Sequence, residues 1–331
     1  MILNSLEELI KVILANKYRV VLLQAPNGLR NKLIKIYDLL KERLSDSTIV
    51  IIDGERRFGG CDLPICTLSY LMNVDAIVHI GHRPFPSRVS LRIPSYYLVL
   101  EEEVDLSIEL LKEIKEIIVR RQSICFLYPP QYKKVTKKII AILSKSDDTR
   151  QIKYIEEMEI LGCEREKIKE VGKKVEVFMV VSPGLFYGLG PAVWTDRETY
   201  VIDLYKQQVV NMRKYAKKYL SLIAYNVSKM KDADNIGIII VLKSGQFNFR
   251  TAMNLKKKIE KLGKKVYLIT MEELTPEKLR YFIDIDLFIQ TGCPRISIDN
   301  LDIFDKPVLN VEQALIALGE IEFTKVYGNA T

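Results

Sequence analysis

The chain has 331 residues, of which 48% are hydrophobic and 28% charged, and its formal net charge is +8. This composition is typical of a globular protein, and the length predicts two or three domains of about 100 to 150 residues each. No apolar run approaches the roughly 18 to 20 residues that cross a bilayer, which excludes a protein built from membrane-spanning helices.

The N-terminal stretch "MILNSLEELIKVIL" carries acidic residues inside an apolar helical pattern and has no basic leader before it. It predicts an amphipathic helix rather than a secretory signal, so we expect a cytoplasmic location. The five cysteines lie far apart and are odd in number, which predicts reduced thiols rather than a disulfide framework. Lysine-rich helix faces account for the positive charge, and without an aromatic-interleaved basic stripe we expect no direct nucleic-acid partner.

The first predicted strand is the apolar stretch "YRVVLLQ" at residues 18–24. The loop "APNGL" leads from it into a predicted helix at residues 30–44 and then into a strand that ends at Asp53. A glycine-rich loop and a short helix precede the next strand, "DAIVHIGH", at residues 75–82. Apolar strands joined through helices by short loops predict parallel β-α-β units.

The same order of strand and helix occurs twice more. It begins again with "SICFLYPPQYKKVTKKIIAIL" at residues 123–143, and a third copy opens with "NIGIIIVLKSGQ" at residues 235–246 and closes with "IDLFIQTGC" at residues 285–293. Between the second and third copies, residues 203–234 predict one long basic amphipathic helix that marks a domain boundary.

These patterns predict an α/β protein of three consecutive, related domains, each with a parallel sheet that is covered by helices on both faces. We place the domains at residues 1–104, 105–204 and 205–331, and the third begins with the long helix. Each contains one cysteine in a loop flanked by glycine.

The cysteines divide into two groups. Cys125 lies inside an apolar strand and Cys66 on the apolar side of a short helix, so both are expected in the core. Cys61, Cys163 and Cys293 each follow a glycine and precede a polar residue or proline. Three thiolates suit a 4Fe-4S cluster with one open iron, whereas structural zinc normally takes four ligands, often from CxxC pairs that are missing here. On spacing alone, separate buried or incidental cysteines are the favoured explanation.

Several motifs resemble the radical-type iron-sulfur subunit of diphthamide synthase. They are "FGGCDLP", "LGCE", "LKSGQ" and "FIQTGCPRISIDN" followed by "FDKPVLNVEQAL", and the resemblance runs nearly from end to end. It implies three related α/β domains around a central cluster site, a homodimer, and a 4Fe-4S cluster whose ligands are Cys61, Cys163 and Cys293.

The resemblance also implies an activity. Such enzymes cleave S-adenosylmethionine between sulfur and the γ carbon, which yields a 3-amino-3-carboxypropyl radical and methylthioadenosine. The radical adds to a histidine of translation elongation factor 2, the first step of diphthamide biosynthesis. We therefore expect elongation factor 2 as the protein substrate, with an electron donor as a further partner.

The amino-acid end of S-adenosylmethionine needs a guanidinium fork or backbone N–H groups to hold its carboxylate. The candidates are Arg295 and the loop that contains Lys243, Gly245 and Gln246. For Arg295, a salt bridge with Asp299 is the structural alternative, so Asp299 belongs to the same candidate site.

Two further positions follow predicted strands. Gln24 ends the first strand, and His82 lies just beyond a later one, so both are candidates for cofactor contact. His79 alternates inward and is expected in the core. Where the family often carries "G-x-F-H-P-L-G", this chain has "GLFYGLG" with Tyr187 and Gly188, which leaves the role of that histidine in doubt here.

Two alternatives differ in class. One is a quinolinate synthase-like 4Fe-4S dehydratase, which would form no methylthioadenosine. The other is a non-enzymatic basic RNA-binding scaffold, which would stay colourless after treatment with iron and sulfide and would bind nucleic acid in a strongly salt-dependent manner.

Overall fold

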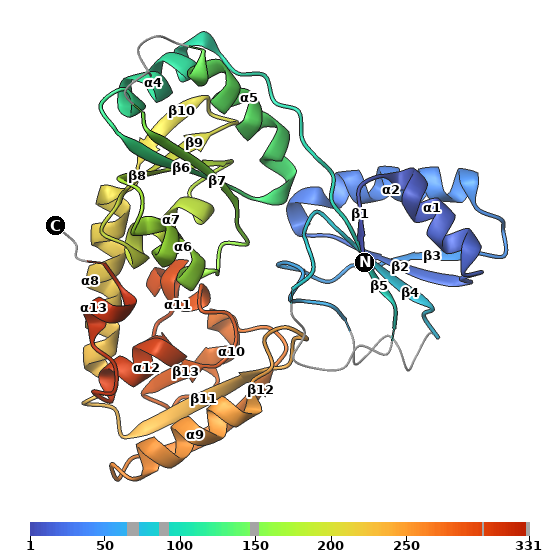
Figure 1. Ribbon diagram of the computed structural model, residues 1–331. Coiled ribbons are helices and arrows are strands. Elements are labelled where there is room, and N and C mark those ends of the chain that lie inside the picture. Colours follow the sequence, from blue (N-terminus) through green and yellow to red (C-terminus); the bar gives the residue numbers. More distant parts are fainter. Residues whose placement is uncertain (65–72, 86–92, 146–151, 300, 329–331) are drawn as a thin grey trace. The chain divides into compact units, whose positions relative to one another are not determined.

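The structure is a computed structural model that describes residues 1–64, 73–85, 93–145, 152–299 and 301–328 (Figure 1). The chain forms two compact units. The first comprises Met1–Glu101 with the later segment Val241–Asn248, and the second comprises Glu102–Ile240 with Phe249–Thr331.

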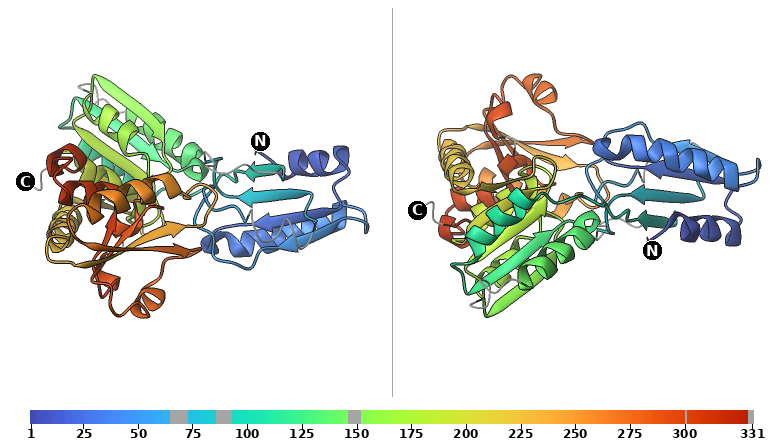
Figure 2. Two further views of the ribbon diagram at one scale, coloured as in Figure 1. Left: turned by 90° about the horizontal axis from the view of Figure 1, so that it is seen from below. Right: turned by 90° about the horizontal axis from the view of Figure 1, so that it is seen from above.

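The first unit is built on a five-stranded, fully parallel sheet in the order β1-β5-β4-β2-β3. Its strands are β1 (Ile2–Leu3), β2 (Val20–Gln24), β3 (Ile49–Ile52), β4 (Ala76–Ile80) and β5 (Ser95–Leu98). Helices α1 (Leu6–Ala15) and α2 (Arg30–Arg43) pack side by side on one face (Figures 1 and 2), and a short 3-10 turn, η1 (Asn27–Leu29), precedes α2. Ser5 caps α1 by accepting a hydrogen bond from the Glu8 amide, which satisfies a free donor of the first turn.

The second unit contains two sheets, of which the first has the order β10-β9-β8-β6-β7. Its strands are β6 (Ser123–Tyr128), β7 (Tyr154–Glu159), β8 (Val177–Ser182), β9 (Glu198–Asp203) and β10 (Gln208–Asn211). Its helical segments are α4 (Ile108–Ile118), η2 (Pro130–Tyr132), α5 (Lys133–Ser144), α6 (Arg165–Gly172) and α7 (Phe186–Trp194). Alternate residues of β6 enter different cores: Phe126 packs with α4 and α5, whereas Cys125 packs with α6 and α7.

The other sheet of this unit has four strands in the order β12-β11-β13-β14, and β13 pairs in parallel with both β11 and β14. Its strands are β11 (Asn235–Val241), β12 (Lys265–Met271), β13 (Leu287–Gln290) and β14 (Val308–Asn310). The accompanying helices are α8 (Arg213–Lys229), α9 (Phe249–Glu260), α10 (Pro276–Arg280), α11 (Ile296–Asp299), η4 (Leu301–Ile303), α12 (Val311–Ala317) and α13 (Phe323–Val326). A capping box between Asn310 and Gln313 starts α12 directly at the end of β14.

The prediction of a mostly parallel α/β fold is confirmed. The prediction of one helix over residues 203–234 is wrong at its start, because β9 and β10 form an antiparallel pair and α8 begins only at Arg213. The three domain limits stay a prediction, because the division into two compact units does not test them.

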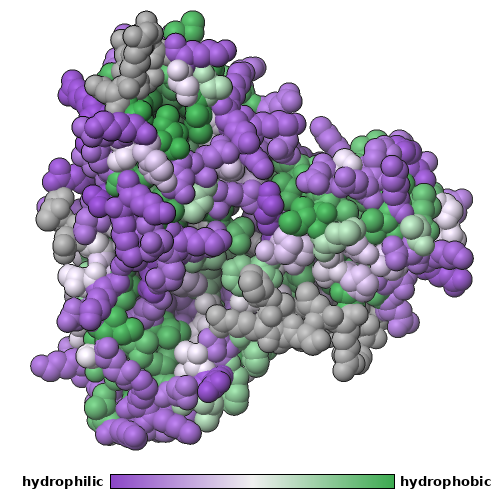
Figure 3. All heavy atoms as spheres, in the orientation of Figure 1, coloured by the Kyte–Doolittle hydropathy of each residue, from purple (hydrophilic) through white to green (hydrophobic). Residues whose placement is uncertain are grey.

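Hydrophilic side chains cover most of the face shown in Figure 3. Among the described helices, none is long and apolar enough to cross a membrane.

Candidate functional site

The Cys61 loop of the first unit is held by the segment that follows β11. The Gly245 amide donates to the Cys61 carbonyl at 2.9 Å, and the Ser244 hydroxyl accepts from the Leu63 amide at 3.0 Å. A Cβ at Gly245 would lie 2.7 Å from the Cys61 Cβ, so only glycine allows this close approach. The sequence "KSGQ" is therefore a clamp on the Cys61 backbone.

Lys243 completes this clamp through a buried ion network. Its ammonium pairs with Asp62, which is only 1% exposed, and lies 4.7 Å from the centre of the Phe58 ring. Arg57 pairs with Asp62 at 3.1 Å and with Asp53 at 2.6 Å. Because a buried carboxylate is costly without a partner, the pairs with Lys243 and Arg57 compensate Asp62 beside Cys61.

Gln246 reaches the cysteine sulfur itself. Its side-chain nitrogen Nε2 lies 3.3 Å from Cys61 Sγ, and the residue is only 6% exposed. The amide is thus a buried donor directed at the sulfur.

A hydrogen-bonded chain connects Gln24 with the two histidines. Gln24 Nε2 donates to the Asp62 carbonyl at 2.9 Å and lies 2.8 Å from His79 Nδ1, and His79 Nε2 lies 3.0 Å from His82 Nδ1. Since the Asp62 carbonyl only accepts, Gln24 must present its nitrogen, so His79 Nδ1 accepts and the His79 proton is on Nε2. By the same logic His82 carries its proton on Nε2.

Both imidazoles are held in the neutral form. Burial lowers the pKa of His79 well below its ordinary value, helped by His82 and Arg57. Burial likewise lowers the pKa of His82 to about 4. At physiological pH the hydrogen-bonded series of Gln24, His79 and His82 therefore ends in an uncharged N–H group on His82.

The second unit contains Cys163 and Cys293. Gly162, before Cys163, has φ +82°, and a Cβ there would lie 2.8 Å from the Phe186 ring. Arg295 links the two cysteine loops, because its Nη1 donates to the Gly162 carbonyl at 2.6 Å.

The other donors of the 3% exposed Arg295 are also occupied. Its Nε donates to Asp299 at 2.8 Å and its Nη2 to the Phe186 carbonyl at 2.5 Å, while the guanidinium lies 4.1 Å from the centre of the Phe186 ring. Burial raises the pKa of Asp299, and the Arg295 cation opposes that rise. Of the two interpretations of Arg295, the structure contains the salt bridge with Asp299, and the guanidinium acts as a brace for the Cys163 loop.

Cys293 lies at the carboxyl end of β13 in a turn that Gln290 closes. The Gln290 side chain donates to the Cys293 carbonyl at 2.7 Å and accepts from the Gly292 amide at 2.8 Å. Burial raises the pKa of the Cys293 thiol to about 11, the backbone N–H of Arg295 opposes this rise, and the neighbouring Cys163 adds to it. Cys163 and Cys293 therefore interact electrostatically within one unit.

The structure thus gathers the predicted site residues into two sets. Cys61, Lys243, Gly245 and Gln246 form one, to which Gln24 and His82 connect through Asp62. Cys163, Cys293, Arg295 and Asp299 form the other. The sets belong to different units, so the meeting of all three cysteines stays a prediction.

The core prediction is confirmed for Cys125, which is fully buried and whose pKa burial raises. Cys66 lies outside the described residues. The three glycine-flanked cysteines are partly exposed.

Sequence reasoning missed several residues that support the site. Asp62 and Ser244 hold the Cys61 loop, and Phe186 fills the space beside Gly162. Tyr187 also lies against Gly162, and burial raises its pKa to about 12. Only their positions in the sequence could have indicated these residues. Asp62 directly follows Cys61, and Phe186 directly precedes Tyr187, where the sequence differs from the family motif.

The residues present fit an iron-sulfur cluster. Cysteine thiolates are the ligands that iron-sulfur clusters take, and N–H groups directed at Cys61 and Cys293 suit sulfurs that bear negative charge. Among the described residues, no three histidine, cysteine or carboxylate side chains gather closely enough to hold a metal ion, so the fit rests on the separate loops.

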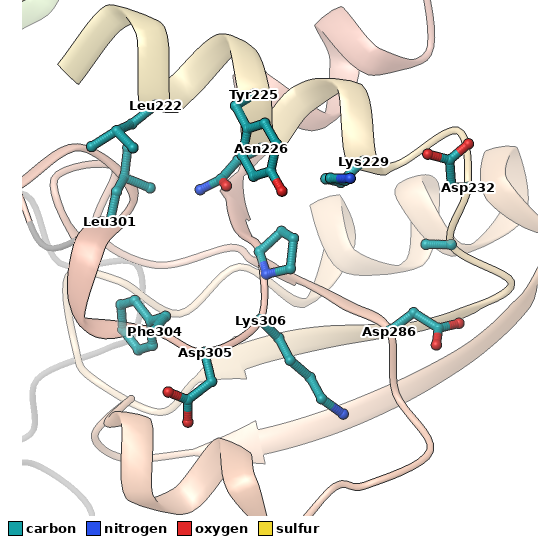
Figure 4. Close-up of a pocket in the computed structure, with 12 residues that line it drawn as sticks. Leu222, Tyr225, Asn226, Lys229, Asp232, Asp286, Leu301, Phe304, Asp305 and Lys306 are labelled. Atoms are coloured by element: carbon teal, nitrogen blue, oxygen red, sulfur yellow. The ribbon is translucent and has the colours of Figure 1, made fainter. Parts of the chain in front are cut away.

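The second unit contains two cavities. One, of about 380 Å³, lies between α8 and the segment before β14, and Figure 4 shows Tyr225 and Asn226 on the α8 side of it and Asp305 and Lys306 on the opposite side. The other, of about 200 Å³, is lined by aromatic residues of α7 and α8 and by Asp299. Neither is lined by a cysteine.

Comparison with known proteins gives consistent results. A family model described as "Putative diphthamide synthesis protein" matches residues 25–328. A Pyrococcus horikoshii protein named "2-(3-amino-3-carboxypropyl)histidine synthase" is 27% identical, with 93% of this chain and 89% of the relative covered. A Methanocaldococcus jannaschii protein of the same name is 26% identical, with 88% and 82% covered.

Solved structures agree with these sequence matches. The crystal structure of Dph2 from Pyrococcus horikoshii superposes with a TM-score of 0.80 at 25% identity and covers 96% of this chain and 91% of that one. A second structure, of Dph2 with a 4Fe-4S cluster, has a TM-score of 0.80 at 26% identity and covers 99% and 95%.

Proposed function

The chain belongs to the diphthamide synthesis family, and from this premise we propose that it is a 2-(3-amino-3-carboxypropyl)histidine synthase. As a transferase, it moves the 3-amino-3-carboxypropyl group of S-adenosylmethionine to a histidine of translation elongation factor 2. Support comes from relatives of that name that align over most of their length. The observation that carries the proposal is the bracing of two cysteine loops, that of Cys61 by residues 243–246 after β11 and that of Cys163 by Arg295 after β13.

Cys61, Cys163 and Cys293 would hold a 4Fe-4S cluster, the group that accompanies Dph2 in one of the two Pyrococcus horikoshii structures. When bound, such a cluster supplies one electron to the sulfonium, whose bond to the γ carbon breaks into a 3-amino-3-carboxypropyl radical and methylthioadenosine. No acid or base is needed for that cleavage, because no proton moves. The radical then adds to a ring carbon of the acceptor histidine, and the adduct must lose one electron and one proton to restore the ring. In the cleavage step, the work of the chain is to bind S-adenosylmethionine, orient it and exclude water.

The candidate residues fall into two groups, those that fix a cysteine loop and those that could contact the substrate. Lys243, Gly245 and Gln246 fix the Cys61 loop, and Arg295 with Asp299 fixes the Cys163 loop. His82 offers an uncharged N–H donor and is the candidate best placed to contact the substrate, with Gln24 setting its tautomer through His79. All seven remain candidates for the S-adenosylmethionine site.

The proposal includes the partners of the reaction. Elongation factor 2 supplies the acceptor histidine, an electron donor reduces the cluster, and the enzyme works as a homodimer in the cytoplasm.

The test is anaerobic reconstitution with iron and sulfide, followed by dithionite and S-adenosylmethionine and identification of the nucleoside by mass spectrometry. Methylthioadenosine is expected, and elongation factor 2 should gain the 3-amino-3-carboxypropyl mass. Deoxyadenosine, or no nucleoside from a chain with a full cluster, would overturn the proposal.

A further inference from the structure

Gln246 occupies an unusual position for a neutral side chain in this site. The segment Lys243–Gln246 is closed by hydrogen bonds from the amides of Gln246 and Phe247 to the Lys243 carbonyl, at 3.0 and 2.9 Å. This turn points the Gln246 side chain at Cys61, where Nε2 lies 3.3 Å from Sγ. The turn fixes the backbone from which the side chain reaches the sulfur.

When Cys61 ligates a metal, this hydrogen bond can form in one direction only, with Gln246 as the donor and the sulfur as the acceptor. A thiolate sulfur has no proton and can only accept, so the amide must present its nitrogen. Because Gln246 is 6% exposed, water does not compete effectively for this donor.

The ion network around Asp62 contains as many carboxylates as cations. Asp53 and Asp62 are paired with Arg57 and Lys243, which makes two carboxylates and two cations. This network therefore adds no net charge at the sulfur, whereas the Gln246 dipole is directed at it.

We propose that Gln246 sets the reduction potential of the cluster through an N–H to sulfur hydrogen bond at Cys61. This inference rests on the proposed function. Reduction adds negative charge to the cluster sulfurs, and a donor stabilises the more negative state, so the hydrogen bond makes the cluster easier to reduce. Cys293 receives a backbone N–H from Arg295, which substitution of a side chain leaves in place, whereas the Gln246 contact at Cys61 can be removed by substitution.

The experiment is a redox titration of the reconstituted full-length enzyme, followed by electron paramagnetic resonance, for the wild type, Gln246→Leu and Gln246→Glu. Leucine removes the donor at similar volume, and glutamate replaces it with a negative acceptor. We expect Gln246→Leu to reduce the ratio of reduced to oxidised cluster about tenfold at a fixed potential, equivalent to about 59 mV for one electron. Gln246→Glu should shift the potential further in the same direction.

Gln208→Leu makes the same chemical change at an exposed position of β10 and should leave the potential unchanged. Iron and sulfide content is measured for every variant, so a loading defect is separated from a redox effect. If Gln246→Leu fails to load, the comparison of wild type with Gln246→Glu decides.

An unchanged potential in a fully loaded variant would overturn the inference and leave the proposed function intact. An unchanged potential with a raised KM for S-adenosylmethionine would also overturn it and make Gln246 a substrate contact. If the wild type itself binds no cluster, the proposed function fails first, which is a distinguishable result.

Discussion

Asp62 is 1% exposed and carries its negative charge between Lys243 and Arg57. Such a buried network stabilises little compared with an apolar core, but removal of one member leaves the others uncompensated. The stability of the Cys61 loop therefore depends on the pairing of Asp62 with Lys243 and Arg57.

We predict that Asp62→Asn lowers the free energy of unfolding by about 3 kcal/mol, because it leaves the Lys243 ammonium buried without its partner. The measurement is urea denaturation monitored by circular dichroism. Asp302→Asn is the matched control, since its pair with Lys218 is about half exposed and contributes under about 1 kcal/mol. Equal effects of the two substitutions would contradict the prediction.

The neutral histidine pair predicts acid sensitivity. His82 has a pKa of about 4 in the folded chain, against roughly 6.5 when unfolded, so below pH 6.5 the unfolded chain binds protons more readily. Stability from this group is complete above about pH 6.5 and is lost as the pH falls towards 4, by up to about 3 kcal/mol.

The measurement is the free energy of unfolding from pH 7 to pH 4 for the wild type and His82→Asn. The variant should lose less stability over this window, because asparagine does not titrate. Parallel curves would show that His82 is not held neutral.

At the scale of elements, the loops between strands and helices carry the site. The segment after β11 and the turn after β13 arise from neighbouring parallel strands, and each reaches a cysteine loop that belongs to another sheet. Glycines allow these contacts at Gly245 and Gly162, where a Cβ has no room.

We predict that Gly245→Ala displaces the Cys61 loop, because the new Cβ would meet Cys61 and Phe85 at 2.7 Å. Overpacking of this kind costs about 1 to 3 kcal/mol, and the variant should bind less iron while its far-ultraviolet circular dichroism is unchanged. Gly54→Ala, where nothing lies within 4 Å, is the control and should load normally. Normal iron content in both variants would contradict the prediction that Gly245 is needed to position the Cys61 loop.

At the scale of the whole molecule, the proposed ligands are divided between the two units, with Cys61 in one and Cys163 and Cys293 in the other. The chain crosses between units to place residues 241–248 beside Cys61. A cluster held in this way would require both units to be folded.

Alanine at Cys61, Cys163 or Cys293 is therefore expected to abolish stable cluster binding, measured as iron and sulfide per chain and as visible absorbance. Cys125→Ala is the matched control, because Cys125 lies in the core and should affect stability without affecting loading. Equal loss of iron in all four variants would count against the three-ligand assignment.

The parallel α/β class, the core position of Cys125 and the separation of three glycine-flanked cysteines from it could all be predicted from the sequence, because periodicity and local composition are properties of short segments. The antiparallel pair of β9 and β10 could not be predicted in this way. Residues 203–211 have a helical pattern of apolar residues, but part of this segment pairs with β9 as a strand instead. The tertiary structure alone decided the partners of the polar residues: Lys243 pairs with Asp62 across 181 positions, and Arg295 with Gly162 across 133. A charged or amide side chain takes whichever partner the path of the chain brings within about 3 Å, and that path is set by the packing of whole sheets and helices.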